Sequence, residues 1–442
     1  MAGNLTPHQS VQLRKATAGP IGILGGGPGT GKTYTVAQLV RRLESSVGLD
    51  QICVGAPTGK AAVRVTETLS KHGIRLRART WHSILCGGTD SGFVFNREHP
   101  LPFSVLISDE TSMVDTGLMA GILRARPRGA MTLLVGDVNQ LPPVGHGAPL
   151  RDLIAAGLPY GELTEIKRNS GGIVEACHAI RLSEPWTCGD NLQLVDAGTP
   201  EQQIDWMLRT ISGLPSGVDR IIDCQVLAAV NERSPLARRA LNVILQAELN
   251  GSGASAGGNP FRVDDKIVNT KNGRFPVVEF DEHDTDADVN DKGEVYVANG
   301  ELARVLHVEP TLTIARLENP VRVVKIPRGQ PSGADDSEAN EIEGATGTGC
   351  SWDLGYCLSV HKSQGSEWPV VITMLDDYLG ARMVCCREWI YTAISRAKDR
   401  QFLIGRKSTA DAMCRRPAIW KRKTFLREQI LLERAKEELL NL

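Results

Sequence analysis

A glycine-rich segment near the N-terminus carries residues that could bind phosphate. Residues 26–33 read Gly-Gly-Pro-Gly-Thr-Gly-Lys-Thr, which fits the pattern G-x-x-x-x-G-K-[ST]. Glycines let backbone N–H groups wrap phosphate oxygens, the lysine reaches the terminal phosphates, and the last hydroxyl ligates Mg²⁺. The segment therefore predicts a nucleoside triphosphate site, with Thr33 as a metal ligand. The residues expected to surround the phosphates are Gly27, Pro28, Gly29, Thr30, Gly31, Lys32 and Thr33.

Two adjacent carboxylates follow a later apolar run and could complete that site. Asp109 and Glu110 come directly after Val105–Ser108. By itself such a pair is as typical of a surface turn, but a P-loop upstream requires an acidic partner of this kind. We expect Asp109 to hold the metal and Glu110 to polarise the attacking water. Gln140 ends the region after the next apolar run, Met131–Val135, where a γ-phosphate sensor would lie.

Two arginines are candidates for stabilising the transferring phosphoryl group. Arg168 ends the string Leu-Thr-Glu-Ile-Lys-Arg, and Arg396 lies in Tyr-Thr-Ala-Ile-Ser-Arg-Ala-Lys. Hydrolysis benefits from such a positive charge, often supplied from another domain. Taken alone, each string favours a surface arginine over a functional one.

The elements that must position these residues alternate between strand and helix. Short apolar runs at residues 21–24, 52–55, 105–108 and 131–135 are separated by helical stretches at 32–43, 59–70 and 115–124. This alternation predicts an α/β fold with a parallel sheet that binds ligands at the carboxyl ends of its strands. A second segment of this type covers about 225–249 and resumes at 358–373 and 387–405.

A different pattern separates the two α/β segments. Residues 250–260 form a linker of small residues, and short β-like pieces follow at 261–270, 294–298, 301–308, 311–317 and 321–326, which predicts a small barrel. Two acidic loops, 279–291 and 329–349, interrupt it. Asp284, Asp286 and Asp288 suggest a calcium loop, but Val289 and Val295 occupy the positions that need Gly and Glu. We interpret both loops as solvated insertions.

Composition excludes few classes of protein. The 442 residues carry 50 basic and 51 acidic side chains, and this balance counts against a DNA-binding role unless acidic charge is concentrated elsewhere. The two acidic loops provide that concentration. No window reaches about 18 uninterrupted apolar residues, so no membrane span is expected. The N-terminus lacks a signal pattern, which favours the cytoplasm. Residues 423–442 predict an amphipathic helix that packs on the fold or binds a partner.

Taken in order, these strings resemble the RecD/Dda-like group of superfamily 1 helicases. Leu5–Gln9 is similar to the Q motif, which implies that Gln9 contacts the adenine base. Residues 26–33, 109–113 and 136–144 resemble motifs I, II and III, and the two arginine strings resemble motifs IV and VI. Residues 360–367 resemble motif V, which couples DNA to the nucleotide and implies that Gly365 and Glu367 contribute to the nucleotide site.

The resemblance also implies which residues contact DNA. Residues 56–62 are similar to motif Ia, and Thr80-Trp81-His82 resembles a following Thr-x-His contact. A strand-separating pin is expected at residues 84–103, where Phe93 and Phe95 would stack on bases or simply pack the hairpin. The expected DNA contacts are Pro57, Thr58, Lys60, Thr80, His82, Phe93, Phe95, His361 and Lys362.

These matches imply two RecA-like motor domains, one at 1–170 and the other at 171–258 and 350–442, with an SH3-like β insertion at 259–349. They imply an ATP- and Mg²⁺-dependent DNA helicase that moves 5′→3′ on single-stranded DNA and acts at junctions between single- and double-stranded DNA.

Candidate partners are a single-strand-binding protein and replication or repair proteins. The alternatives are a translocase that displaces proteins and a RecD-like subunit of an exonuclease complex; RNA is an alternative substrate. Because the chain starts at the Q motif, a compact Dda-like protein is expected.

Overall fold

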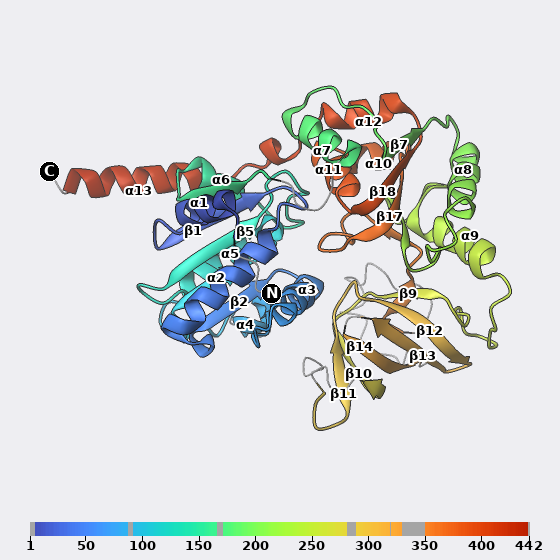
Figure 1. The fold of residues 1–442 in the computed structure, drawn as a ribbon, viewed down its shortest axis with the longest axis horizontal. Helices are drawn as coiled ribbons and strands as arrows, with labels where there is room; N and C mark the ends of the chain where they lie inside the picture. The colour runs from blue at the N-terminus through green and yellow to red at the C-terminus, as the bar shows by residue number, and fades with distance from the viewer. Residues whose placement is uncertain are drawn as a thin grey trace. The chain divides into compact units, whose positions relative to one another are not determined.

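The computed structural model describes residues 5–86, 92–165, 171–280, 289–318, 320–328 and 350–440. The chain folds into two compact units (Figure 1). The first comprises Met1–Thr187, Cys386–Ser395 and Ala412–Leu442, and the second comprises Cys188–Cys385 and Arg396–Asp411. This division differs from the predicted domain bounds, because residues 171–187, 386–395 and 412–442 lie with the first unit. The assignment to two motor domains stays a prediction.

The first unit is built on a parallel six-stranded sheet. The strand order is β3-β2-β4-β5-β1-β6, so the P-loop strand β1 lies between β5 and β6. The strands are β1 Ile21–Gly26, β2 Ile52–Ala56, β3 Arg79–Thr80, β4 Val105–Ser108, β5 Met131–Gly136 and β6 Tyr160–Leu163. The order places the ends of β1, β4 and β5 side by side, and these are the strands that precede residues 26–33, 109–110 and 136–140.

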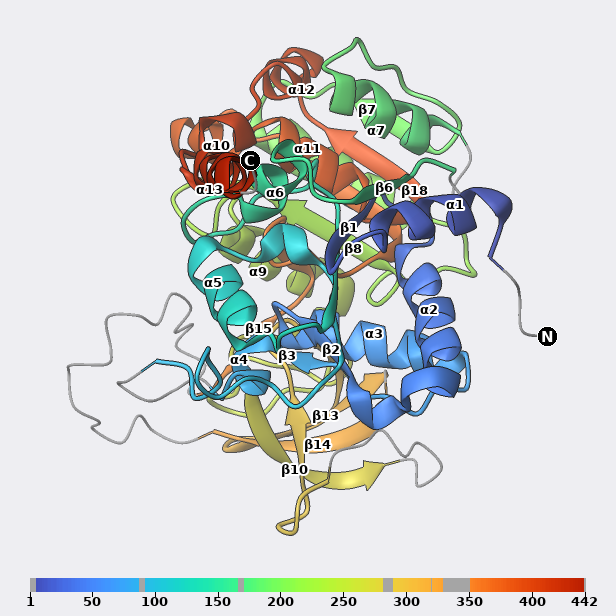
Figure 2. The same ribbon diagram turned by 90° about the vertical axis from the view of Figure 1, so that its left-hand side faces the viewer.

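Consecutive residues of these strands face opposite sides of the sheet, as the strand period of two requires. Ile23 and Leu106 belong to one buried cluster, whereas Leu24 and Ile107 belong to another. Both faces are therefore apolar, and helices cover both (Figure 2). The helices on one side are α1 Pro7–Ala16, α2 Lys32–Val47 and α3 Gly59–Lys71, and those on the other are α4 Trp81–Ile84, α5 Thr116–Ala125 and α6 Pro149–Ala155.

Three further helices complete the first unit. Helices α7 and α11 pack on each other, and α13 packs on α6 through Leu426 and Ile430. Their bounds are α7 Gly172–Leu182, α11 Arg387–Ile394 and α13 Leu426–Leu440. Short 3₁₀ turns occur at Leu49–Gln51 (η1), Thr111–Met113 (η2) and Ile419–Lys421 (η4).

The second unit contains a parallel five-stranded sheet of order β16-β8-β17-β18-β7. Its strands are β7 Leu192–Val195, β8 Cys224–Ala228, β16 Cys357–Ser359, β17 Trp368–Met374 and β18 Ala397–Ile404. Its helices are α8 Pro200–Ser212, α9 Arg238–Asn250 and α10 Leu379–Val384, and α12 Lys407–Cys414 begins in it. The predicted α/β class is confirmed in both units.

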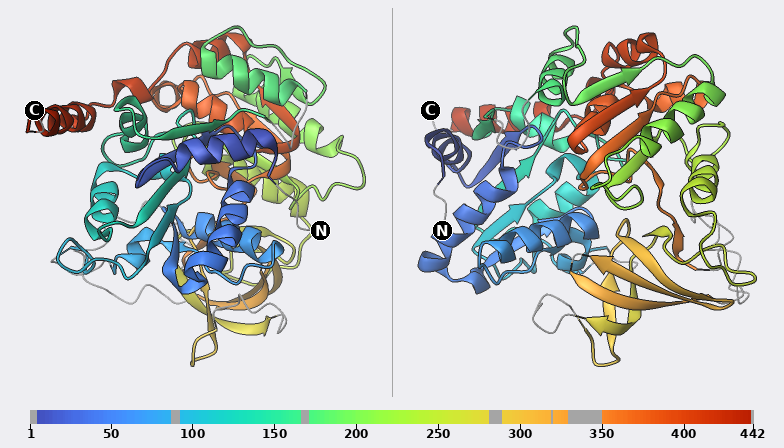
Figure 3. Two further views of the ribbon diagram at one scale, coloured as in Figure 1. Left: turned by 60° about the vertical axis from the view of Figure 1, so that its left-hand side comes forward. Right: turned by 45° about the vertical axis from the view of Figure 1, so that its right-hand side comes forward.

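A seven-stranded antiparallel sheet also belongs to the second unit, and its long strands run side by side in yellow to orange in Figure 3. One buried cluster includes Val226 and Ile372 from the parallel sheet and Val305 and Trp352 from the antiparallel sheet, so the two sheets share a core. The order is β11-β10-β14-β13-β12-β9-β15. The strands are β9 Lys266–Asn269, β10 Gly273–Phe280, β11 Glu294–Val297, β12 Leu302–Glu309, β13 Leu312–Glu318, β14 Val321–Pro327 and β15 Trp352–Leu354.

The antiparallel sheet extends past the predicted insertion, because β15 pairs with β9 after residue 349. Its SH3-like identity stays a prediction. The calcium interpretation at residues 284, 286 and 288 and the acidic loop 329–349 lie outside the described residues. In the described part of the chain, no helix is both long and apolar enough to span a membrane.

Candidate nucleotide and nucleic-acid sites

The Lys32 side chain is hydrogen-bonded to the glycine-rich loop that precedes it. Strand β1 ends at Gly26, and Gly29 and Gly31 take positive φ angles of 72° and 82° that other residues adopt only with strain. Gly31 caps α2, so the helix N-terminus opens directly at the loop. The Lys32 ammonium donates to the carbonyls of Gly26 at 2.8 Å and Gly27 at 3.0 Å. This strand–loop–helix arrangement is the context that gives the sequence pattern its phosphate-binding meaning.

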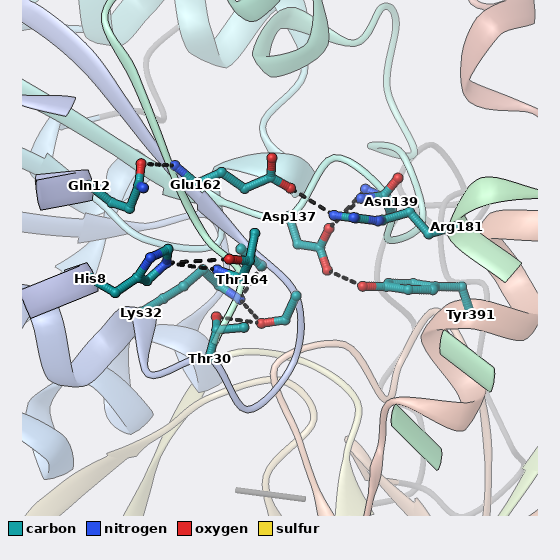
Figure 4. Close-up of polar contacts among 12 residues, drawn as sticks. His8, Gln12, Thr30, Lys32, Asp137, Asn139, Glu162, Thr164, Arg181 and Tyr391 are labelled. Atoms are coloured by element: carbon teal, nitrogen blue, oxygen red, sulfur yellow. Dashed lines mark hydrogen bonds and ion pairs between the residues drawn. The ribbon is translucent and has the colours of Figure 1, made fainter. Parts of the chain in front are cut away.

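Gln9 reaches the same loop from the first helix. Thr6 and Gln9 form a capping box: the Gln9 N–H donates to the Thr6 hydroxyl, and the Gln9 side-chain oxygen accepts from the Thr6 N–H at 3.1 Å. Gln9 is buried, and a Cβ on Gly31 would lie 3.0 Å from its amide nitrogen. Nearby, the His8 ring accepts from the Thr164 N–H at 3.1 Å (Figure 4). Because the Gln9 oxygen is engaged in the capping box and its amide nitrogen lies close to Gly31, the amide nitrogen is the part of Gln9 that faces the glycine-rich loop.

Asp109 is placed against the P-loop helix. The Thr33 hydroxyl donates to one Asp109 oxygen at 3.4 Å, and the Glu110 N–H donates to the other at 2.8 Å. Burial, with the nearby charge of Glu110, raises the pKa of Asp109 from 3.8 to about 6, against the lowering effect of that hydrogen bond and of Lys32. A divalent cation at this carboxylate would offset the desolvation.

Two side chains in the segments that follow β4 and β5 present buried oxygens that accept no hydrogen bond from the described residues. One is Oε2 of Glu110, and the other is Oε1 of Gln140. A buried acceptor without a donor costs about 1–3 kcal/mol. Glu110 also takes φ 49°, in the left-handed region. A hydrated metal–nucleotide complex would supply donors to both oxygens, so the residues present fit such a group.

Helix α11 contributes a tyrosine to this site, which sequence reasoning did not assign. The Tyr391 hydroxyl donates to Asp137 at 2.9 Å and would lie 3.3 Å from a Cβ on Gly27 (Figure 4). Burial, then the charge of Asp137, raises the pKa of Tyr391 well above its usual range. Thr392 accepts from the Leu141 N–H at 2.9 Å. Helix α11 is thus hydrogen-bonded to the loop after β5.

A pocket of about 140 Å³ opens between the P-loop and helices α7 and α11. The Arg181–Glu162 ion pair, 2.7 Å long, lies at this pocket (Figure 4). The pocket is lined by Gly27, Pro28, Thr30, Leu163, Thr164, Ile173, Val174, Cys177, His178, Arg181, Tyr391 and Ser395. It offers space beside the phosphate-binding loop for part of a ligand.

The structure describes only one of the two candidate arginines. Arg168 lies outside the described residues. Arg396 is buried in the second unit, where its guanidinium donates to the Ser366 carbonyl at 3.2 Å. The structure therefore brings Arg396 together with the predicted Gly365 and Glu367, and Gly365 takes a positive φ of 75°. Its assignment as an arginine finger stays a proposal.

Two threonines predicted to contact DNA cap helices. Thr58 accepts from the Ala61 N–H at 3.2 Å and begins α3, and Thr80 accepts from the Ser83 N–H at 3.2 Å and begins α4. These helices follow β2 and β3, which pair in parallel at the edge of the sheet. Both helix N-termini open at the carboxyl ends of their strands, where backbone N–H groups favour phosphate.

Five further predicted DNA contacts are described: three belong to the first unit and two to the second. Pro57 and Lys60 are half-buried beside Thr58, and His82 is exposed after Thr80. In the second unit His361 and Lys362 are half-buried in the turn that follows β16, where the Ser359 hydroxyl accepts from the Lys362 N–H at 3.3 Å.

Comparison with known proteins agrees with this geometry. Residues 9–146 match the model of an AAA domain, and residues 354–404 match the UvrD-like helicase C-terminal domain. The chain is 33% identical over 413 residues to the ATP-dependent RecD2 DNA helicase of Deinococcus radiodurans, covering 91% of this chain and 49% of that protein. It is 27% identical to the RecBCD enzyme subunit RecD of Mycobacterium tuberculosis, covering 90% and 68%.

In sequence the chain is similar to RecD-like helicases. It spans about half the length of the Deinococcus relative. The fold is similar to that of Pif1 helicases in a structure on unwinding at forked double-stranded DNA, with a TM-score of 0.54 at 18% identity, over 99% of this chain and 98% of that one. A Bacteroides Pif1 helicase solved with ADP-AlF3 and single-stranded DNA gives a TM-score of 0.51 at 18% identity, over 94% and 93%.

The pin expected in a RecD-like helicase is described only in part, because residues 87–91 lie outside the described residues. Phe93 and Phe95 are half-buried and pack on the cluster beneath α4 and α5. A Cβ on Gly121 would lie 2.6 Å from the Phe93 ring, and the His82 ring lies 6.0 Å from it. This packing favours the interpretation that both aromatics stabilise the hairpin.

A tryptophan inside the predicted Thr-x-His contact was also not assigned from the sequence. Trp81 is fully buried, and its ring lies against Gly55, where a Cβ would approach within 2.4 Å. Its indole N–H donates to the Ser108 hydroxyl at 2.9 Å. Trp81 therefore links the strand before Asp109 to the segment that carries the predicted DNA contacts. The only available signal was an aromatic between two polar residues.

Proposed function

We propose that this chain is an ATP-dependent DNA helicase that moves 5′→3′ along single-stranded DNA and unwinds duplex. The observation that carries the proposal is the 3.4 Å contact between Thr33 and Asp109, with Lys32 on one side and the buried, unpaired Glu110 oxygen on the other. These groups converge at the ends of neighbouring parallel strands, which is the geometry of P-loop hydrolysis.

Each side chain has a defined role in that reaction. Lys32 would leave its two carbonyl partners to bind phosphate oxygens, and Thr33 and Asp109 would hold Mg²⁺, which neutralises charge on the β- and γ-phosphates. Glu110 would orient and polarise the attacking water, and the buried Gln140 amide would report the presence of the γ-phosphate. Gln9 would bind the adenine through its amide nitrogen, because its oxygen is engaged in the capping box.

The second motor domain would supply the remaining parts. Arg396, together with Arg168, would stabilise the charge that develops on the phosphoryl group, at a contribution of about 10³-fold or more in kcat. Gly365 and Glu367 would couple the nucleotide to the DNA held by His361 and Lys362. The bounds 1–170 for the first motor domain and 171–258 with 350–442 for the second are part of this proposal, although residues 171–187, 386–395 and 412–442 lie with the first compact unit.

DNA would follow the edge of the first sheet at which α3 and α4 begin. Pro57, Thr58, Lys60, Thr80 and His82 would contact phosphates there, with little sequence readout. The direction of movement rests on the resemblance of the motifs to the RecD/Dda-like group, because no contact among the described residues fixes it.

The test is ATP-dependent unwinding of duplexes that carry either a 5′ or a 3′ single-stranded tail, with Lys32→Ala as the matched control. We expect only the 5′-tailed duplex to open, and the variant to lose unwinding while keeping its fold. Preference for a 3′ tail would contradict the proposed direction. Absence of DNA-stimulated hydrolysis in the wild-type chain would refute the motor itself.

A translocase that displaces proteins without unwinding duplex is the second candidate. The packing of Phe93 and Phe95 against the core favours it, because a wedge needs an aromatic that is free to meet a base pair. Hydrolysis stimulated by single strands, with displacement of a bound protein but no opening of either tailed duplex, would identify this activity.

The proposed setting follows from the substrate. A motor of this kind would act in the cytoplasm on single-stranded DNA and at junctions, in replication, recombination or repair. Candidate partners are a single-strand-binding protein or, as for the mycobacterial relatives named as RecBCD subunits, other components of a nuclease complex. Co-purification of the tagged full chain with DNA-processing proteins would test this.

A further inference from the structure

The segment between α12 and α13 concentrates positive charge in a chain that is otherwise balanced. Residues 412–427 contain six basic side chains and no acidic one, whereas the whole chain carries a net charge of −1. Two exposed aromatics are interleaved with them: Trp420 is 66% exposed and Phe425 is 75% exposed. The basic residues are Arg415, Arg416, Lys421, Arg422, Lys423 and Arg427. We call residues 415–427 the basic-aromatic segment.

This segment is held firmly on the first unit. Arg422 donates to the carbonyls of Gly145 and Gly147, and Arg151 donates to those of Ile419 and Arg422. Thr424 donates to Asp152, and the start of α13 packs on α6, where Figures 1 and 2 both place it. The exposure of Trp420 and Phe425 is therefore imposed by an anchored backbone.

The anchoring brings positive charges together. The Arg151 guanidinium lies 5.9 Å from the centre of the Trp420 ring, and Arg151 pairs with Asp152 at 2.5 Å. Burial and the neighbouring Arg151 lower the pKa of Arg422. Lys421, Lys423 and Arg427 remain exposed around these groups. These basic side chains repel one another, and the phosphates of an approaching polyanion would reduce that repulsion and release counterions.

We propose that the basic-aromatic segment is a second binding site for single-stranded nucleic acid, separate from the contacts at α3, α4 and the turn after β16. Lys421, Lys423 and Arg427 would bind the phosphate backbone, and Trp420 and Phe425 would stack on bases. A cationic surface with interleaved aromatics is the pattern by which proteins hold single strands without sequence preference. The Arg151 guanidinium, 5.9 Å from the centre of the Trp420 ring, adds a cation–π contact to that ring.

The basic-aromatic segment lies next to the loop that follows β5. The segment is anchored to Gly145 and Gly147, which follow the loop after β5 that carries Gln140. Val144 in the same loop is 88% exposed. On the proposed function, a strand bound there would lie next to the loop in which Gln140 would sense the nucleotide, and the site would retain DNA between cycles of hydrolysis.

A matched pair of tryptophans makes the proposal testable. Trp206 on α8 is 42% exposed and also carries an arginine over its ring, with Arg209 at 5.6 Å, but that arginine pairs with the neighbouring Asp205 at 2.9 Å. The full chain, Trp420→Ala with Phe425→Ala, Lys421→Ala with Lys423→Ala, and the control Trp206→Ala would be titrated with oligothymidylate of about 30 nucleotides, longer than the roughly 4–16 that one binding fold covers.

We expect part of the quenching of tryptophan emission by the oligonucleotide to disappear in the Trp420 variant and to persist in the Trp206 control. Affinity should fall about fivefold or more in the aromatic double variant. The slope of log affinity against log salt should shrink by about 1.4 in the lysine double variant, since each phosphate contact on a single strand contributes about 0.7. Unstimulated ATP hydrolysis should be unchanged in every variant, which verifies the fold.

Three results would overturn the proposal. Equal affinity and quenching in the aromatic variant and the control would show that the segment does not bind DNA, while leaving the motor intact. Equal quenching of Trp420 by a blunt duplex of the same length would contradict the single-strand assignment. Quenching by phosphatidylserine vesicles but not by oligonucleotide would assign the segment to a membrane surface. If the wild-type chain bound no DNA at all, the proposed helicase function would fail together with this site.

Discussion

Replacing Asp109 by Asn should stabilise the nucleotide-free chain at neutral pH while it abolishes hydrolysis. Asp109 is buried, and its carboxylate has only the Glu110 N–H and the Thr33 hydroxyl as hydrogen-bond donors among the described residues. Asn keeps the acceptor for the Glu110 N–H and has nearly the same shape, but it carries no charge that burial must desolvate. The same change removes the carboxylate that we assign to the metal.

The magnitude follows from the pKa of Asp109, which burial raises from 3.8 to about 6. A difference of about two pH units corresponds to about 3 kcal/mol, at about 1.4 kcal/mol per unit. Because the pKa is raised in the folded state, the Asp109 contribution to stability is present below pH 3.8 and is lost as the pH rises through about 6. The two proteins should therefore be equally stable near pH 4, and the variant should be more stable by up to about 3 kcal/mol at pH 7.5.

The assay is equilibrium unfolding by urea, followed by circular dichroism, at several pH values between 4 and 8. Glu44→Gln is the control, because it neutralises an exposed carboxylate on α2 of the same unit. Added Mg²⁺ and nucleotide should stabilise the wild-type chain and leave the Asn variant nearly unchanged. An Asn variant that is less stable than wild type at pH 7.5, or that keeps the wild-type dependence on pH, would refute the argument from desolvation.

Three further predictions concern other parts of the site. Arg396→Ala should lower kcat by about 10³-fold and leave ATP binding unchanged, and Arg396→Lys should rescue little because it lacks the planar fork; single-turnover hydrolysis and nucleotide titration separate the two effects. Tyr391→Phe should cost about 1–3 kcal/mol in stability, because it removes a hydrogen bond to the buried Asp137 carboxylate, and thermal unfolding would measure this. Phe93→Ala should lower the thermal midpoint without changing base pairs opened per ATP; a selective loss of unwinding would show instead that the ring acts as a wedge.

The nucleotide site was largely predictable because its chemistry constrains both residue type and order. Residues 26–33 need small residues, a lysine and a hydroxyl at fixed spacing, and Asp109 must follow a strand that is adjacent in the sheet. The strand runs were also recognisable, since both faces of a covered parallel sheet are apolar. These constraints are local in sequence, and the structure confirms the α/β fold that they imply.

Other features depended on contacts between distant segments. Tyr391 lies 254 residues from Asp137 in the chain, and a tyrosine before a candidate arginine carries no sign of its partner. The pairing of β15 with β9 extends the antiparallel sheet past the acidic loop at which the predicted insertion ended. Strand pairing across such a separation is set by the shared core, as by the packing of Trp352 on Phe275, and spacing cannot reveal it.

The sequence of the basic-aromatic segment does not by itself predict a binding site, and the exposure of its aromatic side chains in the structure is what indicates one. From the sequence, residues 423–442 predict an amphipathic helix, and such helices usually bury every large apolar side chain on one face. Leu426 and Ile430 on α13 do pack on the first unit, whereas Trp420 and Phe425, which precede α13, stay exposed although Arg151 and Arg422 fix the backbone beside them. An anchored segment that exposes aromatics among cations, rather than burying them, is explained by a ligand with both rings and charge, and single-stranded nucleic acid has both.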